Sequence, residues 1–203
     1  MKAVYRVSFF VIGIFILTFG VSLTIKAGIG TGAWDGLHVG LAELFGMTVG
    51  RWIMVTGILL MFLNAYLLKK IPEFLALGTI VIVGLSIDFW LLIVLPDWQP
   101  AGNLYRMGAL ATGIIILSFG ICVYLQPQFP ANPLDKLMVA IHKRFNISLM
   151  LAKTAGELIG LIFAFMVKGP IGIGTLIITF SIGPAVQWFY PPVEAFYKKL
   201  VKG

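Results

Sequence analysis

The sequence is poor in charge and in cysteine, and these shortages restrict its class before any motif is considered. Charged residues occupy 11% of the 203 positions, whereas hydrophobic residues occupy 60%. Soluble globular chains carry about a quarter charged residues, so this composition excludes a soluble enzyme and a disordered tail. Cys122 is the only cysteine, which excludes a disulfide within the chain. Its apolar neighbours predict an inert thiol that faces lipid or the protein core.

The usual signatures of catalysis are also missing from the sequence. His38 and His142 are isolated, and the chain contains no His-Glu-x-x-His pattern, no Gly-x-Ser-x-Gly elbow and no cluster of metal ligands. We therefore expect no enzyme, no metal and no cofactor. The 15 basic residues exceed the 8 acidic ones, for a net charge of +7. They are scattered at segment ends, which predicts anchoring in a lipid bilayer and no nucleic-acid partner.

Long apolar runs are what the sequence has in abundance. Six runs of roughly 20 residues are long enough to cross a bilayer core, and they cover residues 7–25, 49–68, 74–95, 106–125, 148–167 and 172–190. Two shorter helical stretches, ending near residues 45 and 144, are too short to span comfortably and are predicted to be re-entrant or interfacial. The expected fold is all-α, a polytopic transmembrane helical bundle that forms a single domain over residues 1–203.

The two halves of the chain resemble one another. Residues 5–20 and 105–120 agree at eight of sixteen positions without a gap, including a Tyr-Arg pair. The same offset of one hundred pairs Asp35 with Asp135, and Gly78-Thr79 echoes Gly174-Thr175 after a small deletion. We interpret this as a duplication, with one repeat over about 1–100 and the other over about 101–203. Each repeat is predicted to hold three long spans and one short broken helix.

Positive charge predicts how the repeats are oriented. Three spans per repeat turn the second copy upside down, and cytoplasmic loops are enriched in Lys and Arg. With six spans and the N-terminus inside, ten basic residues lie on the inner side and four on the outer side. Eight spans in a parallel repeat would give nine against five. We therefore favour six spans in an inverted repeat, with both termini in the cytoplasm.

The segments before the two short helices are the strongest indication of a binding site. Residues 27–37 are rich in glycine and residues 127–137 in proline, and paired interruptions of this kind typically mark the site of transporters built from inverted repeats. Asn132 is predicted to be a helix N-cap, with Pro133 at the first helical position. Free backbone groups in these segments, with Gly28, Gly30, Thr31 and Asn132, would then line a solute path.

Asp35 and Asp135 fall in the first turns of the short helices and admit two interpretations. A carboxylate there accepts backbone N–H bonds and complements the helix dipole, or it lines the path of a solute. Both roles are compatible, because a capped helix makes a rigid wall. Gly36 and Gly40 lie four apart and predict close approach of another backbone.

Charge inside the long spans is costly and therefore informative. Lys153 and Glu157 are four residues apart on one helix face, as a structural ion pair or as part of a solute or proton site. Asp88 lies deep in the third run, and its counterpart in the second repeat is Gln187. A carboxylate and an amide at matching positions predict a polar cavity. The alternatives are that Asp88 lies near the interface or pairs with Lys153.

The repeated segments FGVSLTIKAGIGTGAWDGL and FGICVYLQPQFPANPLDKL, with GPIGIGT near the end, resemble the YczE/YitT-like family of bacterial membrane proteins, most closely its YczE branch. The resemblance implies a fold and a plasma-membrane location, and it supplies no catalytic or binding residues. The function we favour is a small-solute transporter or permease of the bacterial inner membrane, with the solute bound between inverted repeats. The alternative is a non-transporting partner that helps assemble a biosynthetic or envelope complex. A homodimer is compatible with six short spans.

Overall fold

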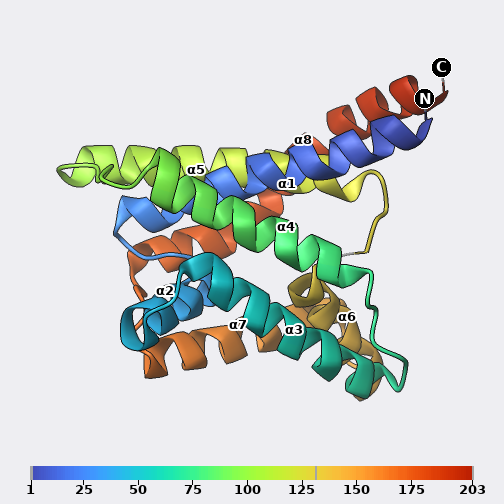
Figure 1. Cartoon of the computed structure of the whole chain (residues 1–203), viewed down its shortest axis with the longest axis horizontal. Coiled ribbons are helices and arrows are strands. Elements are labelled where there is room, and N and C mark those ends of the chain that lie inside the picture. Colours follow the sequence, from blue (N-terminus) through green and yellow to red (C-terminus); the bar gives the residue numbers. More distant parts are fainter. Residues whose placement is uncertain (1, 131, 203) are drawn as a thin grey trace. The chain divides into compact units, whose positions relative to one another are not determined.

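The computed structural model describes residues 2–130 and 132–202, and the regular elements of this part of the chain are all helices, with no strand (Figure 1). The predicted all-α fold is confirmed. Residues 1, 131 and 203 lie outside the described part, so Ala131 of the predicted Pro-rich segment is not placed. The elements in order are α1 (Lys2–Ala27), α2 (Ala33–Phe45), α3 (Val49–Leu68), α4 (Ala76–Asp88), the π-helix η1 (Phe89–Val94), α5 (Asn103–Leu125), α6 (Pro133–Phe145), α7 (Leu149–Met166) and α8 (Ile173–Lys202).

Six helices are long and apolar enough to cross a membrane. They are Ala3–Ala27, Val49–Leu68, Ala76–Val94, Asn103–Leu125, Leu149–Met166 and Ile173–Val201. The short helices α2 and α6 have 13 residues each and are not among them. A helix of that length rises about 20 Å, less than the roughly 30 Å of a bilayer core. Six candidate spans and two short helices agree with the sequence prediction.

Two long elements differ from the predicted runs. The third run is an α-helix only as far as Asp88 and continues as the six-residue π-helix η1. The last run was expected to end near residue 190, before two prolines, but α8 continues to Lys202 with Pro184, Pro191 and Pro192 inside it. A proline φ angle fits a helix, so the helix can continue, but each ring removes one N–H donor. Near a membrane surface, water can bond the carbonyls that lose this donor.

Three of the helix starts follow from identifiable side-chain caps. Thr48 and Ser148 precede α3 and α7, and each hydroxyl accepts a hydrogen bond of 3.2 Å from the backbone N–H three residues on. At α6 the predicted cap is confirmed, because the Asn132 side chain accepts the Leu134 N–H at 3.2 Å and Pro133 is the first helical residue. The bounds of α2 and α6, and the starts of α3 and α7, differ by the offset of one hundred that relates the two halves. The duplication itself stays a prediction.

The chain divides into two compact units, and each unit takes elements from both halves of the sequence. The first comprises Met1–Gly32, Ser86–Phe129 and Pro170–Gly203, with α1, η1, α5 and α8. The second comprises Ala33–Leu85 and Pro130–Gly169, with α2, α3, most of α4, α6 and α7. The units are compact regions of contact and do not coincide with the two predicted repeats, 1–100 and 101–203.

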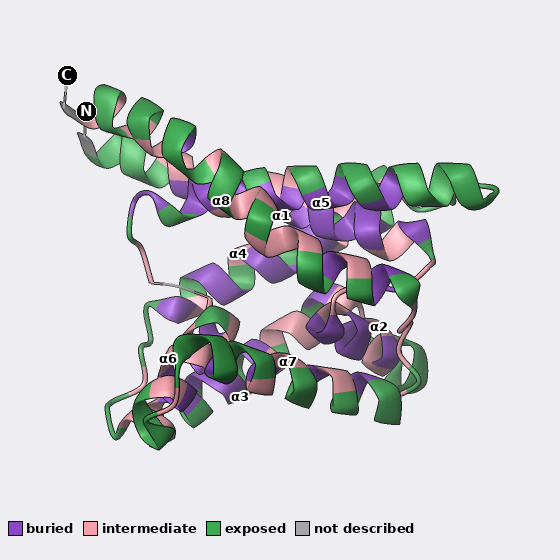
Figure 2. Cartoon of the chain, turned by 180° about the vertical axis from the view of Figure 1, so that it is seen from behind, coloured by how far each residue is buried: buried purple, intermediate pink, exposed green. Residues whose placement is uncertain are grey.

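In the first unit α1 and α5 pack with their backbones in close contact (Figure 1). A Cβ atom added at Gly13, Gly20, Gly113 or Gly120 would lie less than 3 Å from backbone atoms of the opposite helix. Gly13 faces Tyr124 and Gly20 faces Leu117, so the two helices run antiparallel. The facing sides are buried and the outer sides exposed (Figure 2). Small residues allow such close packing where no hydrophobic driving force separates helix from lipid. Cys122 is also buried in this unit, which places its thiol in the core.

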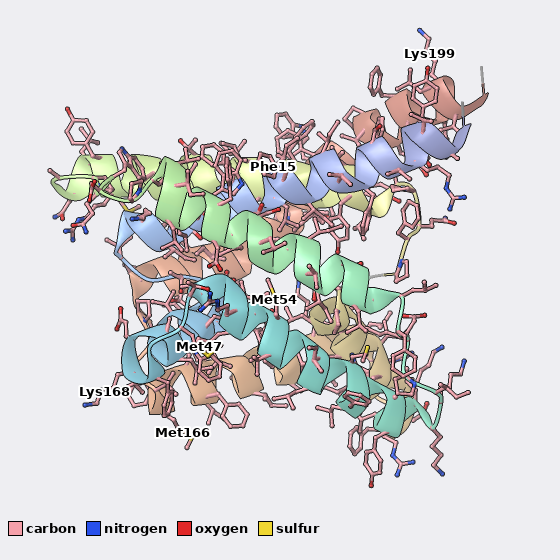
Figure 3. The ribbon with its side chains drawn as sticks, in the orientation of Figure 1. Phe15, Met47, Met54, Met166, Lys168 and Lys199 are labelled. Atoms are coloured by element: carbon pink, nitrogen blue, oxygen red, sulfur yellow. The ribbon has the colours of Figure 1, made fainter. Side chains whose placement is uncertain are left out.

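In the second unit each short helix packs against the long helix that follows its counterpart. Helix α2 contacts α7, and α6 contacts α3. The predicted close approach at Gly36 and Gly40 is confirmed: a Cβ atom at Gly40 would lie 2.9 Å from the Gly169 Cα, and one at Gly169 would overlap the Gly36 carbonyl. Helix α4 contacts α3 in a similar way. Its Gly84 lies against Gly50 and Met54 of α3, and Figure 3 labels Met54.

Candidate functional site

Four of the predicted site residues interact within the second unit. Glu157 on α7 lies close enough to the α2 carboxylate of Asp35 and to the α6 carboxylate of Asp135 for electrostatic repulsion from both. Lys153, one turn before Glu157 on the same helix, attracts it. We call these four residues the acidic cluster. Three carboxylates and one ammonium give the cluster a formal excess of negative charge.

Two members of the acidic cluster are partly buried and two are exposed. Asp35 and Glu157 have partly buried side chains, whereas Asp135 and Lys153 are exposed. Removal from water raises the pKa of Asp35 from 3.8 to about 7, and repulsion from Glu157 adds to the shift. Desolvation and a nearby like charge both favour the neutral acid. Asp35 therefore exchanges a proton close to neutral pH, which an exposed aspartate does not do.

The helix that carries Glu157 is a candidate span. Glu157 stands eight residues after Leu149, the first residue of α7, which corresponds to about 12 Å along the helix axis. This depth is well inside a hydrocarbon core of roughly 30 Å. Ionisable side chains at such depth are costly and typically mark solute, ion or proton pathways. The acidic cluster therefore combines a carboxylate of a candidate span with the first turns of two short helices that are not among the candidate spans.

Sequence reasoning missed a buried polar contact on α2, three residues after Asp35. His38 is 5% exposed, and its Nε2 lies 2.7 Å from the Thr56 hydroxyl of α3. That hydroxyl donates to the Trp52 carbonyl at 2.8 Å, so it accepts from a protonated Nε2. Burial lowers the pKa of His38 to about 3, and the ring is neutral at physiological pH. The signal available in the sequence was the helical spacing of Asp35 and His38, which places both near one face of α2.

The predicted lining residues Gly28, Gly30 and Thr31 lie in the first unit, where Gly30 and Thr31 contact residues 170–175 around the start of α8. The Thr31 N–H donates to the Pro170 carbonyl at 3.1 Å, and the Gly174 N–H donates to the Ile29 carbonyl at 2.8 Å. Thr31 is 1% exposed. Gly28 and Gly30 have φ angles of 67° and 112°, a conformation that favours glycine. Backbone groups of residues 170–174 thus hydrogen-bond to part of the Gly-rich segment 27–37.

The corresponding stretch of the second half is held in a similar way. In the second unit the Thr79 hydroxyl of α4 donates to the Pro130 carbonyl at 3.1 Å, and the Asn64 amide of α3 donates to the Pro133 carbonyl at 2.7 Å. Each broken segment is therefore contacted by the beginning of the last long helix of the other half, at Thr79 and at Gly174. Asn132 caps α6 at the edge of the segment that carries Asp135.

Asp88 and Gln187 both belong to the first unit, and their surroundings differ. Asp88 is partly buried and is the last α-helical residue before η1. A π-helix widens the turn and is often found at functional sites. Phe89 and Trp90 of η1 pack in tilted orientations against Phe15 of α1, with ring centroids 5.4 and 4.5 Å from that of Phe15. Figure 3 labels Phe15. Gln187 has an exposed side chain, and Pro191 cannot donate the usual helix bond to its carbonyl.

The predicted site residues thus fall into two groups. Asp35, Asp135, Lys153, Glu157 and Asn132 lie in the second unit, and Asp88, Gln187, Gly28, Gly30 and Thr31 lie in the first. Within the described residues, no group of three or more His, Cys, Asp or Glu side chains is arranged to hold a metal ion. The acidic cluster is the group in which three different helices bring charge together. It can bind a cation by charge attraction, and it can take up or release a proton at Asp35.

Comparison with known proteins places the chain among bacterial relatives. The DUF6198 family, described as a family of unknown function, matches residues 4–191. The uncharacterized protein YyaS of Bacillus subtilis (strain 168) is 36% identical over 186 residues, which cover 92% of this chain and 92% of YyaS. The uncharacterized membrane protein YczE of the same organism is 31% identical over 193 residues, 94% of this chain and 87% of YczE. The resemblance to the YczE branch is confirmed. No solved structure matches.

Proposed function

This chain belongs to the DUF6198 family of unknown function, and we propose that it is a small-solute transporter of the bacterial inner membrane. It is a multi-pass membrane protein, as its similarity to the membrane protein YczE and its six long apolar helices indicate. The proposal includes a non-enzymatic role. It also places both termini in the cytoplasm, because the six-span arrangement puts ten basic residues on that side against four on the other.

The observation that carries the proposal is the acidic cluster. Asp35, Asp135 and Glu157 come from three helices, and two of these helices are too short to span a bilayer. Carboxylates of like charge repel, so they are not gathered for stability alone. A structure that only needed α7 to pack would use apolar side chains at position 157. The excess of negative charge favours a cationic solute, and the titration of Asp35 near neutral pH suits proton coupling.

The exchange of partners between the two halves supports a site built from inverted repeats. Helix α2 packs on α7 while α6 packs on α3, and the antiparallel pair α1 and α5 is formed by elements related by the sequence offset. Each broken segment is held by the last long helix of the other half, through Gly174 or Thr79. Two halves that exchange equivalent contacts are what an inverted duplication around a central site predicts.

The binding part of this proposal can be tested with purified protein in detergent. We expect a panel of small cations, such as putrescine, guanidinium and choline, to contain a compound that raises the thermal midpoint in a saturable way. A ligand present at a hundred times its Kd adds about 2.7 kcal/mol to the folded state. Glu157→Gln is expected to abolish this shift because it removes the central carboxylate. The measurement is a thermal-shift titration at pH 6 and pH 8, with amino acids and small carboxylates as comparison compounds.

The matched control is Glu43→Gln, which removes the exposed carboxylate of α2 outside the acidic cluster. This variant is expected to keep the full shift. A shift that persists in Glu157→Gln would exclude the cluster from the binding site. A protein that responds to no compound of the panel, and that instead copurifies with one partner in stoichiometric amount, would favour the assembly role over transport.

A further inference from the structure

We propose that the second unit contains a binding site for an anionic phosphoglycerol headgroup of the surrounding membrane, separate from the acidic cluster. The site is a cavity of about 590 Å³ between the C-terminal end of α3, the connection to α4, and α6. Its charged lining residues are Lys69, Lys70, Glu73, Lys136, Lys143 and Arg144. We call this cavity the basic pocket. Glu73 pairs with Lys136, so four basic side chains are left without an acidic neighbour in the lining.

The position of the basic pocket along the chain places it at headgroup level. Lys69 follows directly on Leu68, the last residue of the candidate span formed by α3. A lysine at the end of a span lies where lipid phosphates are found. Basic pockets between helices at a membrane surface are suited to anionic headgroups, and each Lys or Arg near the surface contributes about 1 kcal/mol. The α3 helix ends with Lys69 in a left-handed conformation at a φ angle of 52°, which turns the chain toward α4.

Basic residues at helix ends are common in membrane proteins, where they set the orientation of the spans. The basic pocket has a second feature, a buried amide with an unpaired oxygen. Asn64 of α3 lines it and is only 2% exposed. Its amide group donates to the Pro133 carbonyl at 2.7 Å, while its Oδ1 has no hydrogen-bond partner within the described part of the chain. A buried acceptor without a donor costs about 1–3 kcal/mol. The unpaired acceptor marks the lining as polar beneath its cationic side chains. A phosphoglycerol headgroup carries both the hydroxyl groups and the negative charge that such a lining attracts.

The loop beside the basic pocket favours a lipid over a soluble phosphate ester. Ile71 lines the pocket and is 84% exposed. Phe74 and Leu75, which follow it, are also highly exposed. Three large apolar side chains next to four cationic ones match a surface that inserts among lipid headgroups, with the apolar groups toward the acyl chains and the cations toward the phosphates. In contact with water alone these three apolar side chains would stay exposed, whereas the acyl chains of a bound lipid would cover them.

The test compares phosphatidylglycerol with phosphatidylcholine, added to the delipidated protein in detergent, by titration of the thermal midpoint or by native mass spectrometry. We expect phosphatidylglycerol to bind in preference. The double variant Lys69→Gln/Arg144→Gln is expected to bind about 30-fold more weakly, as two charges at about 1 kcal/mol each predict. The matched control is Lys168→Gln/Lys199→Gln, which removes the same charge from residues that do not line the basic pocket. Both lysines are labelled in Figure 3. The control is expected to bind as the wild type does.

The outcomes separate the source of the headgroup from general surface charge. Glycerol 3-phosphate that produces the same saturable shift would support a phosphate site that takes its ligand from solution, and no shift from it would support the lipid. Equal weakening in both double variants would overturn the proposal, because charge anywhere on the protein would then suffice. Equal binding of the two lipids by the wild type would overturn it as well. Because the acidic cluster is intact in every variant, none of these results depends on solute transport.

Discussion

Replacement of Gly20 by leucine is expected to prevent stable folding of the first unit. A Cβ atom at Gly20 would already overlap the backbone of Leu117 and lie 2.7 Å from the Gly113 carbonyl, so the larger side chain has to push α1 and α5 apart. Overpacking of a well-packed core costs about 3 kcal/mol when the backbone must move, and here the whole helix pair depends on the contact. We expect the variant to aggregate on extraction or to lose at least that much stability in thermal unfolding.

The control for this prediction is Gly108→Leu on the same α5 helix. A Cβ atom there meets nothing within 4 Å, and the residue is exposed. Leucine has a higher helix propensity than glycine by up to about 1 kcal/mol, so this variant is expected to be as stable as the wild type or slightly more stable. Wild-type stability of Gly20→Leu would show that the backbones of α1 and α5 are not in direct contact.

Replacement of Asp35 by asparagine is expected to change how stability depends on pH. The folded state holds the Asp35 proton up to a pKa of about 7, whereas the unfolded value is 3.8. Between these values the folded state binds more protons, so the ionisation of Asp35 removes stability as pH rises from about 4 to about 7. Asparagine cannot ionise. The free energy of unfolding of the variant is therefore expected to rise relative to wild type over this range, by at most roughly 4 kcal/mol.

The comparison with wild type is needed because His38 acts in the opposite direction. Its pKa is about 3 in the folded state and 6.5 in the unfolded state, so stability due to His38 falls as pH drops below 6.5. The two effects largely cancel in the wild type between about pH 4 and pH 6.5. In the Asp35→Asn variant only the His38 effect remains, so the stability of the variant is expected to rise with pH in this range. Urea or thermal unfolding at four pH values measures both curves, with Glu43→Gln as the unchanged control. Parallel curves for wild type and Asp35→Asn would contradict the burial of this carboxylate.

Much of the fold followed from local sequence physics. Long apolar runs identified six of the helices because only a helix satisfies its own backbone in lipid. The α6 start was readable from Asn132 and Pro133, whose capping geometry is local. The extent of α8 was not predictable from the same rules, because two adjacent prolines normally end a helix. The π-helix after Asp88 was equally hidden, since no local motif indicates it; its Phe89 and Trp90 rings pack on Phe15 of α1.

The candidate site was predictable as a set of residues and not as an arrangement. Intramembrane charge singled out Glu157 and Lys153, and the sequence repeat singled out Asp35 and Asp135, but nothing local indicated that all four interact. That interaction depends on α2 packing on α7, a contact between helices more than one hundred residues apart. His38 was overlooked for the same reason: its hydroxyl partner lies on another helix. The predicted polar cavity at Asp88 and Gln187 stays a prediction.

Transport through the acidic cluster is the central claim, and it is tested most directly by the current that follows a concentration jump. Protein reconstituted in liposomes on a solid-supported membrane would receive the cationic compound that gave the largest thermal shift. The account predicts a transient current for wild type and for Glu43→Gln, and none for Glu157→Gln. Currents of equal size in Glu157→Gln and wild type would contradict it, because the solute would then cross without the carboxylate around which the site is built.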